Sequence, residues 1–331
     1  MPLSLESAYA KCERLANSHY ENFPVAKMVP KRLRKHVAAV YAFARTADDI
    51  ADEEHESIAE DDPARIERLA EFEAQLDVSD PSGLDPRWDW IFAACSDTVK
   101  KFSIPKSLFR DLVSAFAQDV VKKRYADFPE LLDYCRRSAN PVGRLVLLLH
   151  GFSDEERFAM SDDICTALQL ANFWQDMRVD KLKNRIYIPM SDWRGATESE
   201  IFADSAGARV REIVKFQVER TRKLFDRGEK LPSLLPFPLS LEIRATIAGG
   251  RAILDKIESQ GFDTLSKRPA FGRLDKLRIL IRALASRANP TKYPRARARR
   301  GSGKNPTSPS HSSASTSPAR GTWRCFTPSA G

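Results

Sequence analysis

The chain has 331 residues, of which 53 are basic and 45 acidic, and its formal net charge is +8. This excess comes from one end: residues 290–331 hold eight basic residues and no acidic one, and removing these eight from 53 leaves 45 basic against 45 acidic residues over 1–289. A neutral body argues against nucleic-acid binding by the folded part. The five scattered cysteines, without a CxxC pair, argue against a disulfide framework or a zinc site and favour a reducing compartment.

Apolar residues recur at three- and four-residue steps along most of the chain, and no stretch of alternating residues is long enough to build a sheet. We therefore predict an all-α chain. Its expected helices, in chain order, cover residues 1–23, 36–53, a segment opening at Asp61-Asp62-Pro63, 88–102, 106–124, 128–138, 142–150, 161–183, 211–229 and 241–259. Asn140-Pro141 should break or kink the chain, and the Gly249-Gly250 pair suits a close approach of two helices.

The composition changes after about residue 288, where Ser, Pro, Gly and Arg dominate and almost no core-forming residue remains. We predict a helical domain over 1–288 and a disordered basic tail over 289–331. Without a visible signal peptide or an apolar run that could span a bilayer, we expect a cytoplasmic protein. Weak contact of the tail with an anionic inner-membrane surface, at about 1 kcal/mol per basic residue, and an inert solvated tail are both open.

The stretch 36–53 carries acids on its apolar face. Asp48 and Asp52 share one helical stripe with Tyr41 and Ala44. A carboxylate turned toward a core has to be neutralised, and a metal ion is one way to do so. The alternative is an ordinary acidic helix end, because several glutamates follow.

A second acidic helix follows the same pattern. Asn172, Asp176 and Asp180 step by four along one face, with Gln169 one turn earlier. Like charges about 4 Å apart repel by roughly 4 kcal/mol at an effective dielectric near 20. Two such helices facing each other can hold Mg²⁺ between them, because this ion takes one or two carboxylates plus water and phosphate oxygens. The pair therefore suggests a site for a diphosphate, where the metal would stabilise the charge of the departing group.

These motifs resemble those of the squalene and phytoene synthases of the isoprenoid synthase fold, over roughly residues 5–287. The matching segments are residues 48–53, Asn172-x3-Asp176-x3-Asp180, Arg45 three residues before the first Asp, Tyr134-Cys135, Arg185-x-Tyr187-x-Pro189, and Arg124 to Phe128 with Asp119 upstream. The resemblance implies a single helical bundle around a central cavity. It also implies metal ligands at Asp48, Asp49, Asp52, Asn172, Asp176 and Asp180, substrate-binding roles for Arg45, Tyr41, Gln169, Arg185, Tyr187 and Arg268, and a catalytic role for Tyr134.

Departures from the family pattern favour one branch. They are Ser138-Ala139-Asn140-Pro141 after the Tyr-Cys pair, Gln175 and Val179 in the second motif, and Gly249-Gly250 in place of a tyrosine. Together the segments are similar to the bacterial hydroxysqualene synthases of the hopanoid pathway. That resemblance implies conversion of presqualene diphosphate and water to hydroxysqualene and diphosphate, with Mg²⁺ and without NADPH. Companion enzymes of squalene biosynthesis are then expected partners.

Water capture needs a polar group beside an apolar cavity, and Asn140 is the candidate, since an amide both donates to and accepts from water. Alternatively, Asn140 caps the helix that begins after Pro141. Two other functions stay open for the chain. One is head-to-head condensation of two prenyl diphosphates to presqualene diphosphate, squalene or phytoene, and the other is a non-catalytic binding or assembly protein of the same fold.

Overall fold

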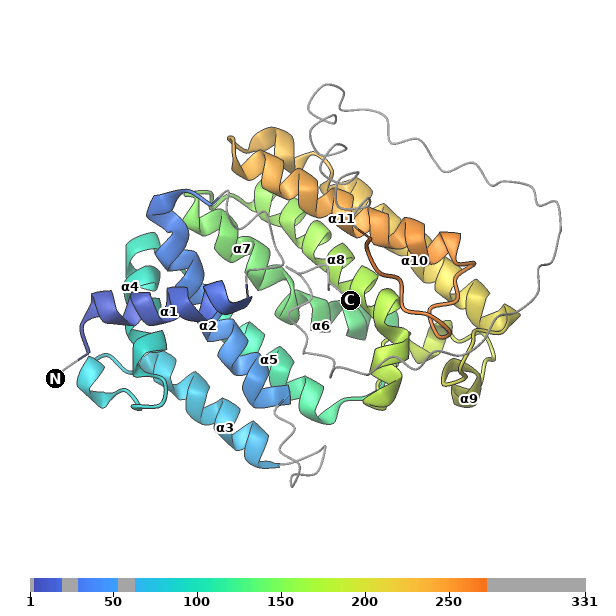
Figure 1. The fold of residues 1–331 in the computed structure, drawn as a ribbon, viewed down its shortest axis with the longest axis horizontal. Helices are drawn as coiled ribbons and strands as arrows, with labels where there is room; N and C mark the ends of the chain where they lie inside the picture. The colour runs from blue at the N-terminus through green and yellow to red at the C-terminus, as the bar shows by residue number, and fades with distance from the viewer. Residues whose placement is uncertain (1–2, 20–28, 53–62, 273–331) are drawn as a thin grey trace.

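The computed structural model describes residues 3–19, 29–52 and 63–272, and within these ranges every regular element is a helix, as predicted (Figure 1). The α-helices are α1 (Leu5–His19), α2 (Lys31–Asp52), α3 (Pro63–Ala74), α4 (Asp89–Phe102), α5 (Ser107–Val121), α6 (Phe128–Ser138), α7 (Asn140–Leu149), α8 (Glu155–Leu182), α9 (Glu198–Ile201), α10 (Ala208–Gly228) and α11 (Leu239–Ser259). Short 3₁₀ turns are η3 (Gln75–Asp77), η4 (Pro81–Gly83), η5 (Met190–Asp192) and η6 (Leu231–Leu234).

Several helices begin earlier than predicted: α2 begins at Lys31 and not at 36, α10 begins at Ala208 and not at 211, and α7 and α8 also begin early. Helix α8 begins at Glu155 and not at 161, because the side chain of Asp154 caps it by accepting a hydrogen bond from the Arg157 N–H. Helix α7 begins at Asn140, so Pro141 lies in its first turn, where a missing N–H breaks no helical hydrogen bond. The chain therefore changes direction at Ala139, one residue earlier than expected.

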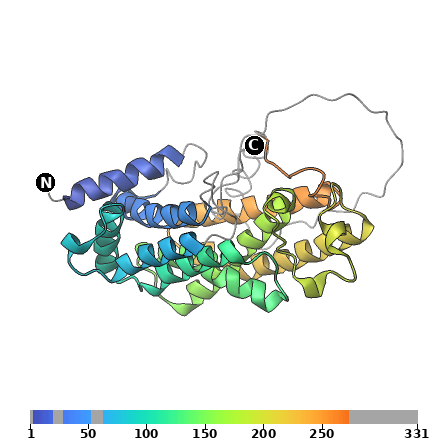
Figure 2. The ribbon, with the colours of Figure 1, turned by 90° about the horizontal axis from the view of Figure 1, so that it is seen from below.

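The helices enclose two clusters of buried apolar side chains. One is built from α1 to α5 and the other mainly from α6, α8, α10 and α11. Helix α7 joins them, because Val142, Leu145 and Leu149 belong to the first cluster and Leu147 to the second. Figure 1 shows the corresponding halves, blue to cyan and yellow-green to orange, with α6 and α7 between them. Figure 2 shows α1 on the outside, over α2.

Close helix contacts depend on glycines at two places. A Cβ atom on Gly143 of α7 would lie 2.3 Å from the Ser161 hydroxyl oxygen of α8. A Cβ atom on Gly250 of α11 would lie 2.4 Å from the Phe225 ring of α10 and 2.8 Å from Leu168 of α8. The predicted close approach is thus confirmed for Gly250. It was wrong for Gly249, where a Cβ atom would meet nothing within 4 Å.

Some predictions fall outside the described residues. These include the tail over 289–331, the boundary near 288, the end of the first expected helix, and Asp61 and Asp62 ahead of α3. Within the described ranges, no helix combines the length and apolar character needed to cross a bilayer.

The contrast between the two neighbouring glycines gives a stability test. Gly250→Ala should lower the free energy of unfolding by about 1–3 kcal/mol, because the added methyl overpacks the α8–α10–α11 contact. Gly249→Ala is the matched control and should raise the free energy of unfolding by up to about 1 kcal/mol, because alanine favours a helix over glycine. Chemical denaturation of both variants measures the difference. Equal effects of the two substitutions would show that the packing at Gly250 is not as tight as described.

Candidate functional site

The first acidic set lies at the C-terminal end of α2, and Arg45 contacts two of its acids. Asp48 is 1% exposed, and its carboxylate lies 3.5 Å from an Nη atom of Arg45. The other Nη atom of Arg45 bonds Asp49, whose side chain is half-exposed. Burial lowers the pKa of Arg45, but the charges of Asp48 and Asp49 outweigh it and raise this pKa overall. Tyr41 lies one turn earlier, and burial raises its pKa to about 12.

The second acidic set lies on the C-terminal half of α8. Asp176 and Asp180 are buried, and Asn172 is half-buried one turn before them. The Nε atom of Arg268 donates to the Asp176 carboxylate at 2.5 Å. Arg268 reaches this position because α8 also holds the chain around it: the Gln175 side-chain amide donates to the Pro269 carbonyl at 2.7 Å. A buried acid therefore pairs with an arginine in both sets, Asp48 with Arg45 and Asp176 with Arg268.

The two sets meet through basic residues that follow α8. Lys183 places its Nζ atom 3.3 Å from the Asp52 carboxylate of α2. Arg185 places an Nη atom 3.9 Å from the same carboxylate. The C-terminal end of α2 and the segment that follows α8, distant in sequence, thus come together at Asp52.

The segment after α8 is fixed by an adjacent stretch of backbone. The Ile186 N–H donates to the Lys123 carbonyl at 3.0 Å, and the Met190 N–H donates to the Tyr125 carbonyl at 2.8 Å. The Arg124 guanidinium adds hydrogen bonds to the carbonyl and side-chain oxygens of Asn184, at 2.5 and 2.9 Å. These contacts explain why the two motifs of residues 124–128 and 185–189 occur together, since the first holds the second in place.

Asp119 of α5 is a site residue to which the sequence reasoning gave no role. It is 2% exposed, and its carboxylate accepts hydrogen bonds from the hydroxyls of Tyr134 at 2.5 Å and Tyr187 at 3.5 Å. Its backbone carbonyl accepts one from Arg185 at 2.9 Å. An acid on the apolar face formed by Leu112, Phe116 and Val120 was the available signal. The partners could not be read from that signal, because they lie on other segments.

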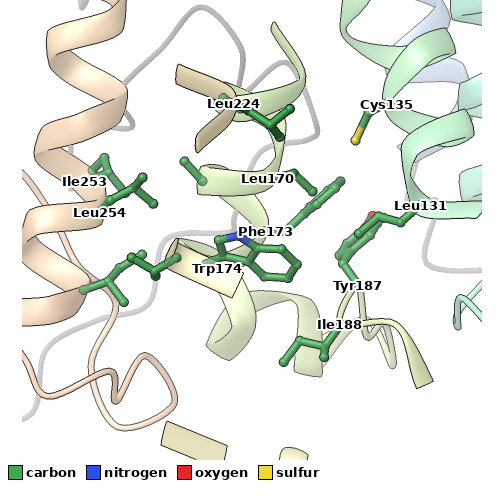
Figure 3. Close-up of a cluster of buried hydrophobic side chains, with 14 of the residues drawn as sticks. Leu131, Cys135, Leu170, Phe173, Trp174, Tyr187, Ile188, Leu224, Ile253 and Leu254 are labelled. Carbon is green, nitrogen blue, oxygen red and sulfur yellow. The ribbon is translucent and has the colours of Figure 1, made fainter. Parts of the chain in front are cut away.

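Aromatic side chains surround this network. The Tyr187 ring stacks on Phe173 with centroids 3.8 Å apart, and Tyr125 lies 5.7 Å from both Tyr134 and Tyr187. Figure 3 shows Tyr187 beside Phe173 on the side of α8 toward α6, and Trp174 on the side toward α11. Burial, followed by the charge of Asp119, raises the pKa of Tyr134 well above its ordinary value, so this phenol stays neutral.

A small cavity lies against the network. Its lining includes Phe173, Trp174 and Tyr187 together with two charged residues, Asp180 and Arg185. Burial lowers the pKa of Arg185, and the surrounding Tyr187, Asp119 and Asp52 raise it overall, so its guanidinium stays charged. The cavity therefore has an apolar wall of aromatic rings beside one acid of the second set and one cation.

The remaining predicted residues lie on neighbouring helices. Asn140 is buried, and its side-chain oxygen accepts a hydrogen bond from the Thr166 hydroxyl of α8 at 3.0 Å. Asn140 is the first residue of α7. The N-cap of this helix is Ala139, and no side chain caps it, so the alternative that Asn140 caps the helix was wrong. Gln169 is buried one turn after Thr166 on α8. Whether these residues act in a reaction stays a prediction.

The donor atoms fit Mg²⁺, which prefers carboxylate and amide oxygens. Among the described residues no three acidic, histidine or cysteine side chains are close enough to hold an ion alone. One or two carboxylates from each set are sufficient when phosphate oxygens and water complete the coordination. Near these acids, Arg45 and Arg185 each keep a buried Nε atom without a hydrogen-bond partner in the part of the chain that the structure describes. Such donors suit an anion that reaches both sets.

The chain is similar to several known proteins. The chain aligns with a crystal structure of squalene synthase HpnC from Alicyclobacillus acidocaldarius at 38% identity, covering 79% of this chain and 97% of that one with a TM-score of 0.71. A dehydrosqualene synthase structure, 20% identical with a TM-score of 0.70 over 85% of this chain and 96% of that one, shares the fold. Phytoene synthase 2 of Solanum lycopersicum is 30% identical over 298 residues, which is 87% of this chain and 93% of that protein.

Phytoene synthase 2 of Zea mays is also 30% identical, over 86% of this chain and 71% of that protein. The all-helical architecture is the isoprenoid synthase fold of these enzymes. Residues 15–275 match the family model described as squalene/phytoene synthase. The chain belongs to the squalene/phytoene synthase family.

Proposed function

We propose that this protein is a hydroxysqualene synthase, which ionises presqualene diphosphate, lets the cation rearrange, and captures it with water to release hydroxysqualene and diphosphate. The observation that carries this proposal is that Lys183 and Arg185, which directly follow the second acidic set, reach Asp52 of the first set. Enzymes of this family act on isoprenoid diphosphates with a divalent metal. The similarity to HpnC at 38% identity supports the squalene branch over the others.

Each group of residues has a distinct part in this reaction. Asp48, Asp49, Asp52, Asn172, Asp176 and Asp180 would hold Mg²⁺, which supplies Lewis-acid stabilisation of the departing diphosphate. Arg45, Arg185 and Arg268 bind and orient the diphosphate by charge-assisted hydrogen bonds. Phe173 and Tyr187 line the cavity beside Asp180 and Arg185, with Tyr134 behind them, and the electron density of aromatic rings suits stabilisation of a carbocation.

Head-to-head condensation of two prenyl diphosphates is the second candidate. It is favoured by the 30% identity to the phytoene synthases of Zea mays and Solanum lycopersicum. Both reactions begin with the loss of diphosphate beside the same acids. The choice therefore depends on which substrate the purified protein consumes.

Substrate consumption separates the two candidates. Purified protein with Mg²⁺ should convert presqualene diphosphate to hydroxysqualene without NADPH, and should not consume farnesyl or geranylgeranyl diphosphate supplied alone. Mass spectrometry of the extracted lipids identifies the products. Formation of squalene or phytoene from the prenyl diphosphates would replace the proposal with the second candidate. Undiminished turnover in excess chelator would exclude the metal-dependent ionisation.

The buried acids of the two sets should be needed for turnover and not for the stability of the fold. We expect Asp48→Asn and Asp176→Asn to reduce turnover at least a hundredfold while the far-UV circular dichroism stays unchanged, because each amide keeps a hydrogen-bond acceptor for its arginine. Asp163→Asn on α8, where Asp163 pairs with Arg227 at the surface, is the control and should keep full activity. Loss of helical signal in both site variants would assign the acids a structural role instead.

Asn140 is proposed to hold the water that captures the cation, and Thr166 fixes its side-chain oxygen. Asn140→Ala should shift the product from hydroxysqualene toward alkenes or rearranged alcohols while diphosphate release continues near its normal rate. Thr166→Val is a matched variant that should cause a smaller shift of the same kind, because it removes only the hydroxyl that orients Asn140. If hydroxysqualene remains the sole product in both variants, Asn140 does not position the water.

A further inference from the structure

Asp119 belongs to neither acidic set, and yet it contacts three of the predicted site residues. Its carboxylate accepts hydrogen bonds from the hydroxyls of Tyr134 and Tyr187, and its backbone carbonyl accepts one from the guanidinium of Arg185. These partners come from α6 and from the segment after α8, while Asp119 itself lies on α5. One buried residue thus joins the segments that form the aromatic end of the site.

The direction of these hydrogen bonds has a chemical consequence. An ionised carboxylate only accepts hydrogen bonds, so both tyrosine hydroxyl protons point toward Asp119. The bond from the Tyr134 hydroxyl is short, at 2.5 Å, and the Tyr187 hydroxyl makes a longer and weaker contact at 3.5 Å. A phenol that donates its proton to a negative charge has increased electron density in its ring.

The aromatic side chains around Asp119 extend to the cavity. Tyr187 is stacked on Phe173, and both line the cavity beside Arg185 and Asp180. Tyr134 is fully buried behind them, with its ring centroid 6.1 Å from that of Tyr187. A negative charge behind neutral aromatic rings strengthens their attraction for a cation in front of them.

We propose that Asp119 is a positioning residue for the reaction proposed above: it accepts the hydrogen bonds of the Tyr134 and Tyr187 hydroxyls, which keeps both phenols from acting as proton donors. It also holds the stacked Tyr187 and Phe173 rings at the wall of the cavity, with Tyr134 behind them, where their electron density stabilises a carbocation. No proton leaves either tyrosine, and no bond forms to Asp119. The proposal rests on the proposed function. It assigns the carboxylate of Asp119 a role in the rate of ionisation and not in the affinity for diphosphate.

Kinetics of single and double variants test this role. Asp119→Asn should lower kcat at least tenfold with KM changed less than threefold, and Asp119→Glu should recover part of the loss. The backbone bond to Arg185 is retained in both. Asp111→Asn on the same helix, where Asp111 lies 3.5 Å from Arg136 near the surface, is the control and should match the wild type.

The coupling to Tyr134 is the decisive readout. If Asp119 acts through Tyr134, the double variant Asp119→Asn/Tyr134→Phe should be no slower than the slower single variant by more than about twofold. If the rate losses of the two single variants multiply in the double variant, the proposal is overturned. A kcat for Asp119→Asn within twofold of the wild type would also overturn it. A loss of activity that follows the fall in melting temperature across all variants would likewise assign Asp119 a structural role only.

Spectroscopy of the free protein checks the contact independently of turnover. The wild type should show a downfield, slowly exchanging phenolic proton in its NMR spectrum, and this signal should be absent in both Tyr134→Phe and Asp119→Ala. Its persistence in Asp119→Ala would show that the carboxylate does not hold the proton, and would overturn the proposal. If the wild type does not consume presqualene diphosphate, the role in catalysis falls with the proposed function, while the NMR result still decides the contact.

Discussion

Buried carboxylates are tolerated in a protein only when their charge is compensated, and this requirement organises the site end of the bundle. Asp48 and Asp176 are each 1% exposed. Asp48 pairs with Arg45, and Asp176 pairs with Arg268. Asp119, which is 2% exposed, is stabilised by tyrosine hydroxyls. Replacing buried ion pairs by apolar side chains is often neutral or stabilising, so these acids are better explained by ligand binding than by stability.

The ion pairs that compensate these buried charges also join distant parts of the chain. Lys183 and Arg185 reach Asp52 of α2 because residues 184–191 are held against the short connection between α5 and α6. The same connection leads into α6, which supplies Tyr134. One irregular segment therefore sets the distance between the two acidic sets and the position of the aromatic rings. Such a segment has no periodicity, and its function is to place Arg185 and Tyr187.

The sequence predicted the features that depend on local periodicity. Helical spacing placed Asp48, Asp176 and Asp180 on core-facing stripes, and the structure confirms their burial. Features that depend on a distant partner could not be predicted. Gly249 and Gly250 are chemically identical, and only the positions of Phe225 and Leu168 show which one is packed.

Helix starts were missed for a different reason. The first turn of α8 is polar, so the apolar periodicity begins after the helix does, and the cap at Asp154 was the better signal. Asp119 had an unusual position on an apolar face, but a single acid does not reveal which hydroxyls it will meet. The tyrosines that it binds come from positions 15 and 68 residues later in the chain.

We propose that both acidic sets bind one diphosphate together, and titration calorimetry with inorganic diphosphate tests this binding without any turnover. The wild type should bind diphosphate with Mg²⁺ present and at least a hundredfold more weakly in its absence. Removing one carboxylate from either set, by Asp48→Asn on α2 or by Asp176→Asn on α8, should abolish the Mg²⁺-dependent part of the binding. If either variant keeps the wild-type affinity, the two sets do not share the ligand, and the account of the site is contradicted.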